Sequence, residues 1–161
     1  MRDFAVLLVA GALVGAGIGA YAPFRGQLPL MWGALGGMCA FGAFALAGEE
    51  LSRICGRSLG WAAGGPIGLA PGGAVWFSLI ADSRYFDPRC PESVALTGGL
   101  TGLMAGAICG SFLGAVALRD EVKANVYHGR PDQLGITVGI LLLEFLFGAF
   151  YFTAFFLIQP L

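Results

Sequence analysis

The sequence predicts an all-α, polytopic integral membrane protein with about five transmembrane helices. Three observations lead to this fold class. Hydrophobic residues make up 57% of the 161-residue chain, charged residues make up only 12%, and apolar runs long enough to cross a bilayer recur along the chain. A spanning helix needs about 20 predominantly apolar residues. We therefore predict a single transmembrane domain over residues 1–161.

The first two predicted spans run from Phe4 to Ala22 and from Leu28 to Gly48. Neither contains a charged residue, and both are rich in Ala, Leu and Gly. The second span ends where Glu49 and Glu50 follow, because an ionised carboxylate is costly in the hydrocarbon region.

The third predicted span, Leu59 to Ala81, contains Pro66 and Pro71. Proline inside a helix removes one hydrogen-bond donor and clashes with the preceding turn. The segment is therefore either a kinked span or a re-entrant pair of half-helices, whose freed carbonyls would be satisfied by protein or water. Its length, 23 residues, favours a kinked span.

The fourth predicted span, Val94 to Leu118, contains a row of five glycines spaced four residues apart. Shorter glycine rows occur in the first three spans. Helices in lipid associate by close van der Waals approach, which small residues permit. The glycines predicted to pack helices are Gly98, Gly102, Gly106, Gly110 and Gly114 in the fourth span, Gly11, Gly15 and Gly19 in the first, Gly33 and Gly37 in the second, and Gly60, Gly64, Gly68 and Gly72 in the third. Packing within one bundle explains any single row. Four rows in so small a chain lead us to expect that at least one, first of all that of the fourth span, faces another subunit.

A weak internal repeat relates residues 31–81 to residues 104–158. Met31–Gly37 resembles Met104–Gly110, and in both halves the helix then ends in two acidic residues. A duplicated helical hairpin explains the match. A chance match between two Gly- and Ala-rich segments explains it equally well.

Lysines and arginines predict the orientation, because they gather in cytoplasmic loops. Arg2, Arg53, Arg57, Arg119, Lys123 and Arg130 fall on the side of the N-terminus, whereas Arg25, Arg84 and Arg89 fall on the other side. We therefore predict a cytoplasmic N-terminus and an outside C-terminus, in a membrane expected to be the bacterial cytoplasmic (inner) membrane. A re-entrant third segment would exchange the sides of all later loops.

Glu144 is the residue that most invites a functional hypothesis. It lies near the middle of the fifth predicted span, Leu134 to Ile158, where an ionisable side chain costs about 2.5–3.5 kcal/mol on insertion scales. Helical spacing places Thr137 and Tyr151 on the same face. Ser111 lies at a similar depth in the fourth span and is a candidate hydrogen-bond partner. Because no Lys, Arg or His lies at membrane depth, we expect a protonated carboxyl unless a partner supplies a cation.

Signatures of catalysis, cofactor binding and metal binding are missing from the sequence. The one histidine, His128, lies in a predicted cytoplasmic loop, and the four cysteines form no CxxC pair. No Gly-Lys-Ser/Thr phosphate loop occurs. The net charge of −1 gives no reason to expect a nucleic-acid partner. We therefore expect neither an enzyme nor a cofactor or metal site.

These observations predict an accessory or scaffolding subunit of a larger membrane protein complex, acting through glycine-mediated helix packing. Its partners would be other membrane-protein subunits or copies of itself, within the lipid bilayer. The loops Asp82–Ser93 and Arg119–Gln133 are either solvated connectors or docking segments. The alternative function is a small homo-oligomeric ion channel or proton-coupled transporter in which Glu144 is the working group.

Overall fold

The computed structural model describes residues 2–21, 28–80, 91–123 and 131–158. Apart from Gly56, all of these residues are helical, and they contain no strand. The five helices are α1 (Arg2–Tyr21), α2 (Leu28–Cys55), α3 (Arg57–Ile80), α4 (Pro91–Lys123) and α5 (Pro131–Ile158). The all-helical prediction is therefore confirmed.

Three of the five helices are long and apolar enough to cross a membrane. Their apolar stretches run over Leu30–Cys55 in α2, Val94–Lys123 in α4 and Gln133–Ala154 in α5. In α1 the comparable stretch is the shorter Phe4–Ile18. These lengths and compositions are consistent with an integral membrane protein.

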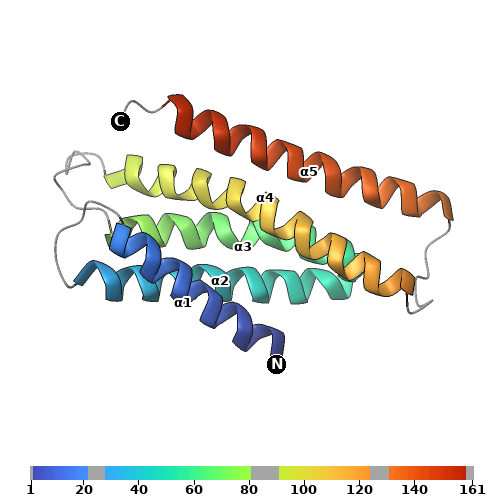
Figure 1. Ribbon diagram of the computed structural model, residues 1–161, viewed down its shortest axis with the longest axis horizontal. Helices are drawn as coiled ribbons and strands as arrows, with labels where there is room; N and C mark the ends of the chain where they lie inside the picture. Colours follow the sequence, from blue (N-terminus) through green and yellow to red (C-terminus); the bar gives the residue numbers. More distant parts are fainter. Residues whose placement is uncertain (1, 22–27, 81–90, 124–130, 159–161) are drawn as a thin grey trace.

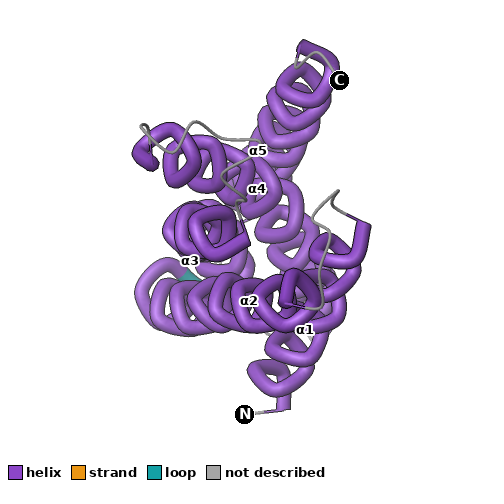
Figure 2. Tube along the Cα trace, turned by 90° about the vertical axis from the view of Figure 1, so that its left-hand side faces the viewer, coloured by secondary structure: helices purple, strands orange, loops and turns teal. Residues whose placement is uncertain are grey.

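Consecutive helices are antiparallel and lie side by side, so that α1 packs on α2, α2 on α3, α3 on α4 and α4 on α5 (Figures 1 and 2). Helix α1 crosses α2 obliquely, whereas α2, α3 and α4 run along one another (Figure 1). Helix α5 lies on the far side of α4, and only a few of its residues reach α3. The order of the helices in space therefore follows their order in the sequence.

The turn between α2 and α3 is the connection between helices that the structure describes in full. Gly56 separates the two helices with a φ of 88°, in the left-handed region that glycine enters without steric cost. The Gly60 N–H then donates a hydrogen bond of 2.8 Å to the Gly56 carbonyl, within the first turn of α3. From there α3 continues through Pro66 and Pro71 as one helix. The two separate half-helices of the re-entrant alternative are not found.

Two small clusters form the interior. Ala40 and Phe44 of α2 meet Leu69 of α3, and the Phe44 ring stands edge-on to Trp61 with ring centroids 5.7 Å apart. The second cluster joins three helices through Ala62, Leu118 and Leu141.

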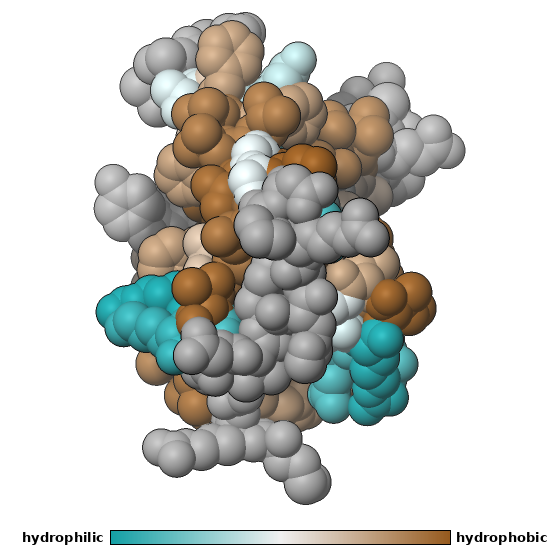
Figure 3. Space-filling view, turned by 90° about the vertical axis from the view of Figure 1, so that its right-hand side faces the viewer, coloured by the Kyte–Doolittle hydropathy of each residue, from teal (hydrophilic) through white to brown (hydrophobic). Residues whose placement is uncertain are grey.

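Most other large apolar side chains point outward, and Leu13 and Leu143 are each 69% exposed. Exposed charged residues gather where α2 and α4 end. Figure 3 shows them in two groups at the sides of this end of the molecule, and the other described residues in this view are mostly apolar. An apolar outer surface with charge at an end is the pattern expected of a bundle surrounded by lipid.

Candidate functional site

The five-glycine row of α4 lies against α3 of the same chain. At each position a Cβ atom would collide with a backbone carbonyl oxygen or a neighbouring backbone atom of α3. The opposed residues are Gly98 and Gly73, Gly102 and Leu69, Gly106 and Gly65, Gly110 and Ala62, and Gly114 and Ser58. The expectation that this row faces another subunit is therefore wrong. Helix α3, the antiparallel neighbour of α4, presents mostly small residues to this row and its backbone carbonyl at Leu69, so α3 itself occupies the row.

The glycine row of α3 contacts α2 in a constant register. Gly60, Gly64, Gly68 and Gly72 are opposed by Ser52, Gly48, Phe44 and Ala40 in that order. Each step of four residues along α3 is matched by a step of four back along α2, so the two backbones stay close over the full row. One further step of four residues leads to Trp76 on α3 and Gly36 on α2, and there the Trp76 indole lies against Gly36.

The first glycine row meets that of the second helix. Gly11 and Gly15 of α1 lie against the backbone of Gly33 and Gly37 in α2. Gly19 lies within α1, but its surroundings fall outside the described residues. The rows on α1 to α4, where they are described, are thus covered by neighbouring helices of the same chain.

Helix α5 is attached differently. Gly135 and Gly139 have nothing within 4 Å of the position of a Cβ, whereas Gly60, which aligns with Gly135 in the internal repeat, packs tightly on α2. Gly148 is the point at which α5 approaches α4 closely, against Met104, Ala107 and Ile108. The two hairpins related by the sequence match therefore pack in different ways.

Glu144 lies at the middle of α5 and is partly buried. Two residues on the same side of the helix are buried against α4: Leu141, three residues before Glu144, and Gly148, four residues after it. The carboxyl therefore lies on the flank of the α4–α5 contact. It forms no hydrogen bond or ion pair with any other residue that the structure describes.

The other polar residues predicted to accompany Glu144 make their contacts with other residues. The Thr137 hydroxyl is buried and donates to the Gln133 carbonyl at 3.0 Å. The Ser111 hydroxyl donates to the Ile108 carbonyl at 3.0 Å, so its predicted bond to Glu144 does not form. Tyr151 is 47% exposed and contacts the rings of Phe147 and Phe150. No polar network forms around Glu144 among the described residues.

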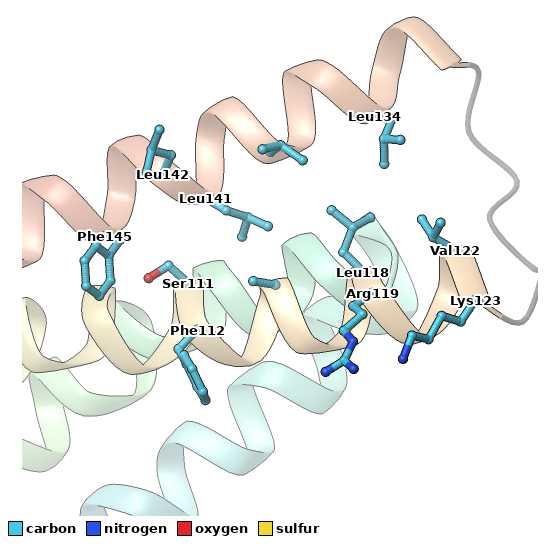
Figure 4. Close-up of a pocket in the computed structure, with 12 residues that line it drawn as sticks. Ser111, Phe112, Leu118, Arg119, Val122, Lys123, Leu134, Leu141, Leu142 and Phe145 are labelled. Carbon is cyan, nitrogen blue, oxygen red and sulfur yellow. The ribbon is translucent and has the colours of Figure 1, made fainter.

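A groove between α4 and α5, which the sequence did not reveal, lies at this interface (Figure 4). It has a volume of about 540 Å³ and is lined almost entirely by apolar atoms. The side chains of Leu134, Leu141 and Phe145 reach from α5 toward α4 (Figure 4). At the end of the groove, Arg119 and Lys123 extend from the last turns of α4. The sequence shows the two cations, four residues apart directly after the apolar span, but not the groove beside them.

The remaining candidate features lie partly or wholly outside the described residues. These include His128, Cys90, the loop Asp82–Ser93 and most of the loop Arg119–Gln133. Among the described residues no group of three or more His, Cys, Asp or Glu side chains is placed to hold a metal ion. Cys39, Cys55 and Cys109 are free thiols. Comparison of the chain with protein-family models, with curated proteins and with solved structures gave no significant match.

Proposed function

We propose that this protein is an accessory subunit of a larger membrane protein complex, and that α5 is the helix that meets the partner. Helices α1 to α4 use their small-residue faces on one another, as the contacts of Gly106 and Gly64 illustrate. Helix α5 keeps a broad apolar surface, including Leu143 and Phe150, each 69% exposed. A partner helix therefore has room on α5 that it lacks on the packed faces of the other four.

The proposal includes a finer description of the fold. All five helices cross the membrane, α1 and α3 included, and close contacts between glycine-bearing backbones hold α1 to α4 together. The antiparallel order of the helices and the 24-residue length of α3 support this. The N-terminus is cytoplasmic and the C-terminus outside, in the bacterial cytoplasmic membrane, as the distribution of Lys and Arg favours.

The observation that carries the proposal is the position of Glu144. An acidic side chain at mid-helix in a bilayer costs about 2.5–3.5 kcal/mol on insertion scales, and that cost calls for a compensating interaction. The described part of the chain offers the Glu144 carboxyl no ion pair or hydrogen bond. A hydrogen-bonding or cationic side chain on a partner helix would supply the missing interaction.

The test is the composition of the particle extracted gently from its own membrane, measured by native mass spectrometry. The wild-type chain should appear with other polypeptides in fixed stoichiometry. Glu144→Ala should lose them, while Glu144→Gln, which keeps the hydrogen-bonding capacity, should retain them wholly or in part. Leu13→Ala is the matched control, because it truncates an equally exposed leucine on α1, away from α5, and should leave the particle intact.

The competing function is a homo-oligomeric channel or proton-coupled transporter, favoured by the same partly buried carboxyl. In that case the particle would contain only copies of this chain, and reconstituted vesicles would show ion or proton flux that Glu144→Gln abolishes. A particle of unchanged composition in Glu144→Ala, or one made of this chain alone, would contradict the subunit proposal.

A further inference from the structure

The groove between α4 and α5 is lined by apolar atoms, and two cationic side chains lie at its edge. Its apolar wall consists of Phe112, Ala115 and Leu118 from α4 with Leu134, Val138 and Leu142 from α5. Its volume of about 540 Å³ lies within the range of about 300–1,000 Å³ that is usual for small-molecule sites. An extended polypeptide would bring unsatisfied backbone polar groups into this wall, whereas a hydrocarbon chain brings none.

The charges at the end of the groove are unbalanced. Arg119 and Lys123 both line it, both are exposed, and neither forms an ion pair with a described residue. Arg53 at the end of α2 is different, because its guanidinium pairs with Glu49 at 3.2 Å and with Glu50 at 3.0 Å. Asp120 lines a separate hollow with residues of α1 and α3. Arg119 and Lys123 therefore contribute their apolar stems to the groove and carry two unpaired charges at its edge, where a negatively charged group could lie between them.

The groove has the depth of one lipid leaflet. On α4 it runs from Ser111 to Lys123, which at 1.5 Å per residue is about 18 Å. Half of the hydrocarbon core of a bilayer is about 15 Å. The cations lie at the end of the apolar stretch Val94–Lys123, where the headgroups of that leaflet would be. Basic pockets between transmembrane helices at this level are known to receive anionic headgroups.

We infer that this groove binds an anionic glycerophospholipid, with one acyl chain between α4 and α5 and the phosphate between Arg119 and Lys123. The apolar wall fits the chain, the depth fits one leaflet, and the two unpaired cations fit the phosphate. The inference requires that α4 and α5 span the bilayer, and it holds whether or not the chain has a protein partner.

The test is a lipid titration of the purified full-length protein in detergent, followed by native mass spectrometry of the lipid-bound fraction. The ligands are phosphatidylglycerol and phosphatidylcholine with identical acyl chains. The wild-type protein should bind phosphatidylglycerol more tightly. The double variant Arg119→Gln/Lys123→Gln should weaken that binding by about 30-fold, the equivalent of about 1 kcal/mol for each cation, and should leave phosphatidylcholine unaffected.

The matched control is Arg53→Gln/Arg57→Gln, which removes the same charge from the same end of the bundle but away from the groove. It should bind phosphatidylglycerol as the wild-type protein does. Ala115→Phe, which places a ring in the groove, should weaken both lipids. If that variant does not fold, the two charge variants still decide the question, because the side chains they replace are exposed and circular dichroism reports their folding.

Four results would overturn the inference. Equal affinity of the wild-type protein for the two lipids would remove the role of the cations. An equal loss in the Arg53→Gln/Arg57→Gln control would show that only overall charge matters. Displacement of the lipid by inorganic phosphate at the same concentration would indicate a plain phosphate site. A second copy of the chain, or another polypeptide, whose presence excludes lipid would show that protein occupies the groove.

Discussion

Replacing Gly106 by alanine tests whether close backbone contact holds α3 and α4 together. A Cβ at this position would collide with the Gly65 carbonyl and with the backbone of Pro66. Both obstacles are backbone atoms, so no side-chain rotation can relieve the collision. The matched control is Gly139→Ala, because a Cβ at Gly139 meets nothing within 4 Å.

The expected magnitude comes from the difference between these two variants. Alanine favours helix over glycine by about 0.8–1.0 kcal/mol, and this gain is common to both. Overpacking typically costs about 1–3 kcal/mol and applies only to Gly106→Ala. We therefore expect Gly106→Ala to have a free energy of unfolding about 1–3 kcal/mol below that of Gly139→Ala, which is about a fivefold to more than a hundredfold difference in the ratio of folded to unfolded protein.

The assay is reversible unfolding in mixed micelles of dodecylmaltoside with increasing dodecyl sulfate, followed by far-ultraviolet circular dichroism. The Gly139→Ala transition should coincide with that of the wild-type protein or occur at a higher dodecyl sulfate fraction, and the Gly106→Ala transition should occur at a lower one. Coincident transitions of the two alanine variants would refute the reasoning, since they would show that the α3–α4 contact accommodates an added methyl group.

Three further predictions use the same unfolding assay. Ser58→Ala removes the buried 3.0 Å hydrogen bond from the Ser58 hydroxyl to the Gly114 carbonyl. It should lower the free energy of unfolding by about 0.6 kcal/mol, the average for such bonds in a membrane protein, and no change would mean that the bond contributes nothing. Gly36→Ala displaces the Trp76 indole, so it should lower the free energy of unfolding by about 1–3 kcal/mol and shift tryptophan emission to longer wavelength. An unchanged emission spectrum would contradict the contact between Trp76 and Gly36. Arg53→Ala removes two exposed ion pairs and should change stability by less than about 0.5 kcal/mol; a larger loss would show that the pairs are more than surface contacts.

The helical class could be predicted from the sequence because it depends on composition and run length, which are local properties. The helix ends were less accessible. The second predicted span stops at Gly48, where the apolar run ends, but α2 continues to Cys55. A span boundary marks a change of solvent, whereas a helix continues while its backbone hydrogen bonds are satisfied, here until Gly56 takes a positive φ.

The neighbours of the glycine rows could not be predicted, because a row of small residues specifies close approach without specifying a partner. The α4 row was expected to face another subunit, yet Gly65 and Gly73 on α3 occupy it. The bond expected between Ser111 and Glu144 failed for a related reason. A helical serine hydroxyl reaches its own preceding turn, and Ser111 donates to the Ile108 carbonyl. The groove was also hidden, because it depends on how far α5 stands from α4.

The two prolines of α3 have a consequence for how the chain enters the membrane. A proline leaves the carbonyl four residues before it without its helical donor, here those of Ala62 and Ile67. The Ala62 carbonyl oxygen lies against Gly110 of α4, which covers it on that side. Rich in glycine and proline, α3 is not among the helices whose own composition suits a span. On the proposed five-span topology, stable insertion of α3 is expected to depend on α2 beside it and on the later arrival of α4, so that the helices enter as hairpins and not as five independent segments.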